Sequence, residues 1–188
     1  MTSRIHRNQI IAALVMMFMT LPSTARSTGF EHLDEARLDA ALALAGANRA
    51  EIARAVAETP ESHRADMIWL VGRMPEADLR AFTATQLLEN LRLSVEAMEA
   101  APWRDQIPRE VFLDAVLPYA VVNERRDDWR ADFRDRFLPI VESAGSPAEA
   151  AALLNQKVFP QVGVKYSTKR PKANQSGLES IDAGLASC

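Results

Sequence analysis

The residue with the clearest chemical potential is Cys188, which is the only cysteine of the chain and its last residue. A cysteine thiolate is a strong nucleophile, and a histidine is the usual base that activates it. The three histidines are His6, His32 and His63, all far upstream of the cysteine. Neither His32 nor Cys188 has a metal-ligand spacing to His63, so we predict no metal site and no cofactor. Cys188 is therefore either a candidate nucleophile or an incidental terminal residue, and composition alone favours the second.

Length and composition indicate an ordinary globular protein. The chain has 188 residues, of which 48% are hydrophobic and 25% are charged, and disordered chains have fewer apolar residues. Its formal net charge of −3 is the wrong sign for a nucleic-acid surface. A single cysteine excludes a disulfide within the chain, so the fold must depend on its apolar core.

Residues 1–25 are typical of a secretory signal peptide. A basic start at Arg4 and Arg7 precedes the unbroken apolar run Ile10–Met19, and the small residues 23–25 follow as a cleavage site. The run is shorter than the roughly 20 residues that span a bilayer. We therefore predict export to the periplasm or the extracellular space, with no stable membrane anchor after cleavage.

The rest of the chain is predicted to be mainly α, with a helical leader over 26–159. Apolar residues recur there at helical spacing, and three such stripes define inward faces. They are Leu38, Leu42 and Ala45; Leu87, Leu91, Val95 and Met98; and Trp129, Phe133, Phe137 and Ile140. An aromatic stripe at this spacing is usually core, although the third stripe could instead line a ligand groove.

Helix starts are predicted from capping patterns, in which a short polar side chain accepts a bond from a free amide of the first turn. These patterns are Asn48 with Glu51, Thr59 before Pro60, Thr83 with Gln86, Ser146 with Glu149, and Ser176 with Glu179. Gly46, Gly145 and Gly184 are predicted helix ends. The alternating charges over 124–136 are predicted to form a solvated helix face, and His63 to be exposed or bonded to the backbone.

The character of the chain changes after Phe159. Alternation over 162–166 predicts a short strand, and the polar stretch 169–177 predicts a loop that precedes one helical turn. That strand would lack most of its partners, so we expect high mobility from about Lys165 onward. Lys165, Lys169, Arg170 and Lys172 form a small basic patch, which is weak support for an anionic partner.

The stretch from Lys165 to Cys188 resembles the approach to the catalytic cysteine in bacterial transglutaminase-like proteins. The resemblance lies in Tyr166-Ser167, Pro171, residues 174–181 and Gly184-Leu185-Ala186-Ser187-Cys188. Upstream stretches resemble the helical leader of one exported branch of that superfamily. They are residues 47–51, Met74-Pro75, Leu117-Pro118-Tyr119, Asn123-Glu124 and Asp128-Trp129-Arg130. Ala120 stands where we would expect a basic residue.

The resemblance implies a fold, a mechanism and a substrate class. Residues 160–188 would be the incomplete start of an α+β core of papain-like type, with Cys188 as the nucleophile of a Cys-His-Asp mechanism. The reaction would be thiol acyl transfer or amide hydrolysis on a protein or peptide amide. The catalytic histidine and acid would lie after the cysteine. We expect this polypeptide alone to be inactive, because Cys188 would have no partners and would sit beside the terminal carboxylate.

Two alternatives remain open at this point. The helical pattern could be a non-catalytic extracytoplasmic binding or scaffold module, which needs nothing after the cysteine to fold. The superfamily scaffold could also persist after its chemistry has been lost. The substrate is not specified by any of these residues, since resemblance to a superfamily indicates a chemistry more than a substrate.

Overall fold

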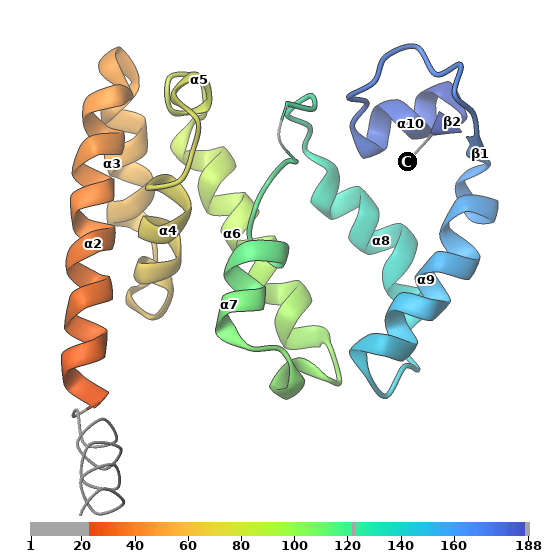
Figure 1. The fold of residues 1–188 in the computed structure, drawn as a ribbon, viewed down its shortest axis with the longest axis horizontal. Coiled ribbons are helices and arrows are strands. Elements are labelled where there is room, and N and C mark those ends of the chain that lie inside the picture. The colour runs from red at the N-terminus through yellow and green to blue at the C-terminus, as the bar shows by residue number, and fades with distance from the viewer. Residues whose placement is uncertain (1–22, 122, 187–188) are drawn as a thin grey trace, which may run out of the picture.

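The computed structural model describes residues 23–121 and 123–186, and over 23–32 it describes the backbone alone. This part of the chain is mainly α, as predicted. Figure 1 shows the helices in a row, with α2 at one edge and α9 and α10 at the opposite edge. The run Ile10–Met19 lies outside the described residues, and the predicted cleavage position after Ala25 falls within α2.

The first half of the chain forms a helical body around one buried core. Its elements are α2 (Ser23–Leu44), η1 (Gly46–Asn48), α3 (Arg49–Glu58), η2 (Glu61–His63), α4 (Arg64–Val71), α5 (Glu76–Leu79) and α6 (Ala84–Ala100). The fully buried side chains include Ile52, Met67, Leu79, Leu87 and Leu117. The predicted inward faces of α2 and α6 are confirmed, since Leu38 and Leu42 of α2 pack against this core and Leu87 and Leu91 of α6 are buried in it.

The second half is more open. Its elements are η3 (Arg104–Gln106), α7 (Arg109–Val111), η4 (Phe112–Val116, a π-helix), α8 (Trp129–Val141), α9 (Pro147–Val162), β1 (Lys165–Tyr166), α10 (Gly177–Ala183) and β2 (Leu185–Ala186). Few of its side chains are buried, and none after Leu117 belongs to the main buried core. None of the helices in the described part is long and apolar enough to cross a membrane.

Three predicted capping patterns are confirmed. The hydroxyl of Thr83 accepts the Gln86 amide, and the Gln86 side chain accepts the Thr83 amide in return. Ser146 caps α9 and Ser176 caps α10, each by accepting the amide three residues on. The Glu179 side chain accepts the Ser176 amide in return, whereas the Glu149 side chain accepts the amide of Gly145. These caps are predictable because both partners lie within one turn of sequence.

Two other predicted caps are wrong, because the side chains have stronger partners elsewhere. The Nδ2 of Asn48 donates to the carbonyls of Leu79 and Phe82, at 2.8 Å each, and does not cap α3. Glu51 accepts the amide of Ala84 instead of completing a box with Asn48. Together these bonds fasten α3 to the connection between α5 and α6.

Thr59 also does not start a helix. Its hydroxyl is buried and donates to the carbonyl of Ala55 at 2.6 Å, which satisfies an acceptor at the end of α3. Pro60 then leads into η2, and α4 begins later, at Arg64. The hydroxyl therefore closes the preceding helix, a role that the sequence pattern does not distinguish from capping the next one.

The predicted strand over 162–166 is shorter than expected, because its first residues end a helix and form a turn. α9 continues through Val162, and Gly163 then adopts a left-handed conformation with φ of 70° that ends it. Only Lys165–Tyr166 forms a strand, and it pairs in parallel with Leu185–Ala186. The strand therefore has one partner within this chain, which the sequence analysis did not foresee.

The bonds of Asn48 can be separated from a capping role by substitution. We expect Asn48→Asp to lower the free energy of unfolding by about 1–3 kcal/mol, because a carboxylate cannot donate to the two carbonyls. A capping role would make the change nearly neutral, since Asp and Asn cap equally well. Urea denaturation at neutral pH measures the difference. Ser146→Asp, at a true cap, is the matched control and should be close to neutral.

Candidate functional site

The segment that leads to Cys188 is a small paired unit. The amide of Lys165 donates to the carbonyl of Gly184 at 2.9 Å, and the amide of Ser167 donates to the carbonyl of Ala186 at 2.8 Å. Ala186 is two positions before Cys188. Cys188 itself lies outside the described residues. The described part of the chain therefore ends with β2, the strand that precedes the cysteine in the sequence.

Helix α10 is anchored to the stretch before α8. The Ser176 hydroxyl is buried, donates to the Oδ2 of Asp127 and accepts the amide of Glu179 at 3.2 Å. The Nδ2 of Asn174 donates to the carbonyl of Asn123 at 2.8 Å. These contacts join residues about 50 positions apart, so the loop predicted over 169–177 is fixed at its far end.

Close packing strengthens this anchor. A Cβ atom at Gly177 would lie 2.7 Å from the Cζ of Phe133, which is closer than real contacts allow. The absence of a side chain at Gly177 therefore lets the first turn of α10 approach the aromatic face of α8. The expectation of high mobility beyond Lys165 has no support in these contacts.

Acidic and basic side chains surround the start of α10. Burial raises the pKa of Asp127, but hydrogen bonds from Arg125 and Ser176 outweigh it and leave that pKa below the ordinary Asp value. A hydrogen bond from Lys172, at 2.6 Å, and the Ser176 amide lower the pKa of Glu179. Both carboxylates are thus charged partners of the anchor at neutral pH.

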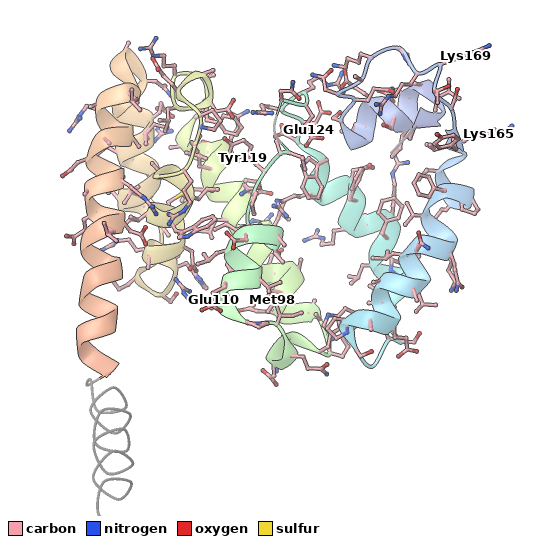
Figure 2. All side chains as sticks on the ribbon, viewed as in Figure 1. Met98, Glu110, Tyr119, Glu124, Lys165 and Lys169 are labelled. Atoms are coloured by element: carbon pink, nitrogen blue, oxygen red, sulfur yellow. The ribbon has the colours of Figure 1, made fainter. Side chains whose placement is uncertain are left out.

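A second network lies at Asp78, which is nearly buried. The Tyr119 hydroxyl donates to Asp78 Oδ2 at 2.7 Å, and the Arg126 guanidinium binds the same carboxylate at 2.9 to 3.1 Å. Burial and the hydrogen bond to Asp78 raise the pKa of Tyr119. The phenol therefore stays protonated at neutral pH and donates a hydrogen bond to Asp78. Tyr119 is labelled in Figure 2.

Arg130 is held by one side-chain amide and by three backbone carbonyls. Its Nε donates to Asn90 Oδ1 at 2.6 Å, and its Nη2 donates to three carbonyls. These are Val116 at 2.6 Å, Leu117 at 3.1 Å and Pro118 at 2.6 Å. Burial lowers the pKa of Arg130 to about 10. The prediction of a fully solvated charged face over 124–136 is wrong here, since Arg126 and Arg130 are half-buried in networks.

His63, which we expected to be exposed or bonded to the backbone, instead has a carboxylate partner. Its Nδ1 lies 3.3 Å from Asp66 Oδ2, and Arg109 Nη2 lies 2.7 Å from the other oxygen. The nearby helix α4 lies on the opposite side of the molecule from β2 (Figure 1). His63 is therefore not brought to the segment before Cys188. No group of His, Cys, Asp and Glu within the described ranges could hold a metal ion.

The aromatic stripe of α8 is half-buried and lies outside the main core, so the prediction that it is core is wrong. The ring centroids of Trp129 and Phe133 are 5.4 Å apart, and those of Phe133 and Phe137 are 5.2 Å apart. Together with residues of α6, Trp103 and Leu154, they line an open groove of about 290 Å³. The competing interpretation of a groove therefore fits the structure.

The predicted basic patch is dispersed. Lys165 and Lys169 are exposed on the far edge of the molecule, where Figure 2 labels them. Lys172 instead pairs with Glu179 within the anchor. The patch therefore offers no concentrated positive surface among the described residues.

The contribution of Asp127 to the anchor can be measured with two serines that cap helices alike. Ser146 and Ser176 each accept an amide at 3.2 Å, but only Ser176 also donates to a carboxylate. Each change to Ala should cost about 1 kcal/mol for the cap, and Ser176→Ala should cost about 1.5 kcal/mol more. Urea denaturation of the two variants gives the difference.

This excess depends on pH with a definite sign. Because the pKa of Asp127 is lowered in the folded state, the excess should be complete above about pH 4, the ordinary Asp value, and decrease as pH falls through the folded-state pKa. Equal costs for the two serines at pH 7 would contradict the assigned role of Asp127.

Comparison of the chain with known proteins found no matching family model, no matching curated protein and no matching solved structure.

Proposed function

We propose that this chain is the N-terminal portion of an exported transglutaminase-like protein, with Cys188 as the nucleophile of thiol acyl transfer or amide hydrolysis. The observation that carries the proposal is the anchored unit formed by β1, α10 and β2. It ends at Ala186, two positions before the cysteine, and Asp127 and Asn123 hold it to the helical region.

An anchored approach is what a nucleophile requires. A reacting group must be held within about 0.5 Å of its productive position, and groups on regular elements are held better than groups on loops. A short parallel strand pair and a capped helix supply regular elements directly before Cys188, which supports the proposal. The helical region would then act as the platform that positions the cysteine.

The proposed reaction transfers an acyl group in two steps. The Cys188 thiolate attacks the carbonyl carbon of a carboxamide, the C–N bond breaks, and the nitrogen leaves with a proton as ammonia or an amine. Water or a second amine then attacks the thioester, and the thiol is regained. Within the proposal, a histidine and an acid from beyond Cys188 move the proton, because His63 is paired with Asp66 at the opposite side of the molecule.

A non-catalytic binding module is the second candidate. The observation that favours it is the helical body of α2 to α6, whose buried core also includes Phe112 and Leu117 but no residue of the segment 165–186. This candidate requires neither a reactive thiol nor the anchored unit. A test of thiol chemistry therefore separates the two.

The test uses the protein translated from the complete open reading frame, whatever its length, beside its Cys188→Ala variant. Incubation with an activated acyl ester should give a burst of released alcohol and a matching acyl mass on the Cys188 peptide. The variant should give neither. The chain of 188 residues alone, as a further comparison, should give no burst.

The proposal also makes a specific claim about the anchor. Ser176→Ala in the complete-frame protein should lower the acylation rate, while Ser146→Ala should leave it unchanged, since only Ser176 binds Asp127. The absence of acylation at Cys188 in the folded complete-frame protein would contradict the enzymatic proposal and favour the binding module.

A further inference from the structure

The groove between α6 and α8 combines an apolar lining with positive charge. Four aromatic side chains line it, and the aliphatic remainder comes mainly from Leu93, Ala97, Leu138, Val141 and Leu154. Its only charged lining residues are Arg130 and Arg134, and none of the lining residues is acidic. An apolar concavity with a few polar groups of one sign is the usual form of a small-molecule site.

The two arginines differ in how their charge is neutralised. Arg134 pairs with Glu96 at 2.9 Å and with Asp135 at 3.4 Å. All hydrogen-bond partners of Arg130 are neutral, and its Nη1 has none among the described residues. Arg130 also lies over the Trp129 ring, 4.5 Å from the ring centroid. A half-buried guanidinium without a carboxylate partner favours an anion at its free edge.

A second cavity at Arg130 is a poorer place for that anion. It has a volume of about 210 Å³ and is lined by Arg126 as well as Arg130, but also by Glu89, Asp127 and Asp128. These three carboxylates would repel an anion there. The aromatic groove is thus the cavity at Arg130 that combines an apolar surface with no acidic lining residue.

We propose that this groove binds a small amphipathic carboxylate, with its apolar part against Trp129, Phe133 and Phe137 and its carboxylate paired with the Arg130 guanidinium. Burial lowers the pKa of Arg130 to about 10, which still leaves the guanidinium charged at neutral pH. An aromatic ring on the ligand would meet the lining rings edge to face, as neighbouring aromatic side chains do. The proposal does not depend on acyl transfer at Cys188.

The size of the groove limits the ligand. Its volume of about 290 Å³ is at the lower end of the range for small-molecule sites, roughly 300–1,000 Å³. A phenylalkyl carboxylate is a probe of suitable shape. Phenylbutyrate supplies one ring, a short chain and one carboxylate, and phenylbutanol is its uncharged counterpart.

Isothermal titration calorimetry of the full chain tests the proposal. Phenylbutyrate should bind roughly tenfold or more tightly than phenylbutanol, because a hydrogen bond to a charged group contributes about 1.5–3 kcal/mol. Phenylbutylamine, with the opposite charge, should bind most weakly. Equal or tighter binding of the alcohol would overturn the role of Arg130, and no binding of phenylbutyrate would overturn the site.

A pair of matched variants locates the binding. Ala97 is an exposed residue of α6 that lines the groove, and Ala57 is an exposed residue of α3 that does not. Ala97→Phe should fill the groove and weaken phenylbutyrate by at least about tenfold, since the ring of the ligand loses its place. Ala57→Phe should leave the affinity unchanged.

Two further outcomes also test the proposed carboxylate site. If Ala97→Phe leaves phenylbutyrate binding unchanged, the ligand binds elsewhere and the proposal fails. If a hydrophobic peptide with a free carboxyl end competes with phenylbutyrate, the carboxylate comes from a peptide and the site is retained. Circular dichroism of both variants confirms that each is folded, and the ligand series on the unchanged chain needs no variant.

Discussion

The guanidinium of Arg130 is the interaction on which the second half of the molecule depends. It ties α8 to α6 through Asn90 and to the end of η4 through the carbonyls of residues 116–118. No carboxylate pairs with it among the described residues, so its charge is stabilised by neutral groups: backbone carbonyls, the Asn90 amide oxygen and the Trp129 ring. Removing it would leave several half-buried acceptors without donors, which costs far more than the loss of one surface pair.

The position of the segment before Cys188 depends on this contact of α8 with α6 and η4. Arg130 fixes the first turn of α8, and the residues just before that turn hold α10 through Asp127 and Asn123. Phe133, one turn further along, packs against Gly177. The order of dependence therefore runs from the helical body to α8 and then to the strand that precedes the cysteine. The open groove lies beside the same contact, with Arg130 in its lining.

Local patterns predicted the elements better than the contacts between them. The mainly α fold, the stripes of α2 and α6 and the caps at Thr83, Ser146 and Ser176 follow from residues within two turns of one another. Asn48 and Thr59 stand in the same sequence pattern as true caps, but Asn48 donates to a distant carbonyl and Thr59 donates to a carbonyl of the helix before it. The candidate nucleophile was proposed from a resemblance to a known superfamily. The anchor at Asp127 and the surroundings of Arg130 could not be predicted from local patterns, because their contacts join residues up to about 50 positions apart.

Hydrogen exchange followed by mass spectrometry tests this order of dependence most directly. Arg130→Gln should reduce amide protection in α8, in α10 and at Lys165 and Ser167, while α3 to α6 keep most of theirs. Arg134→Gln is the control, because it lies one turn further along α8 and pairs at the surface. It should leave the protection pattern unchanged. If Arg130→Gln altered protection uniformly, or left residues 165–186 unaffected, the central role of this guanidinium would be contradicted.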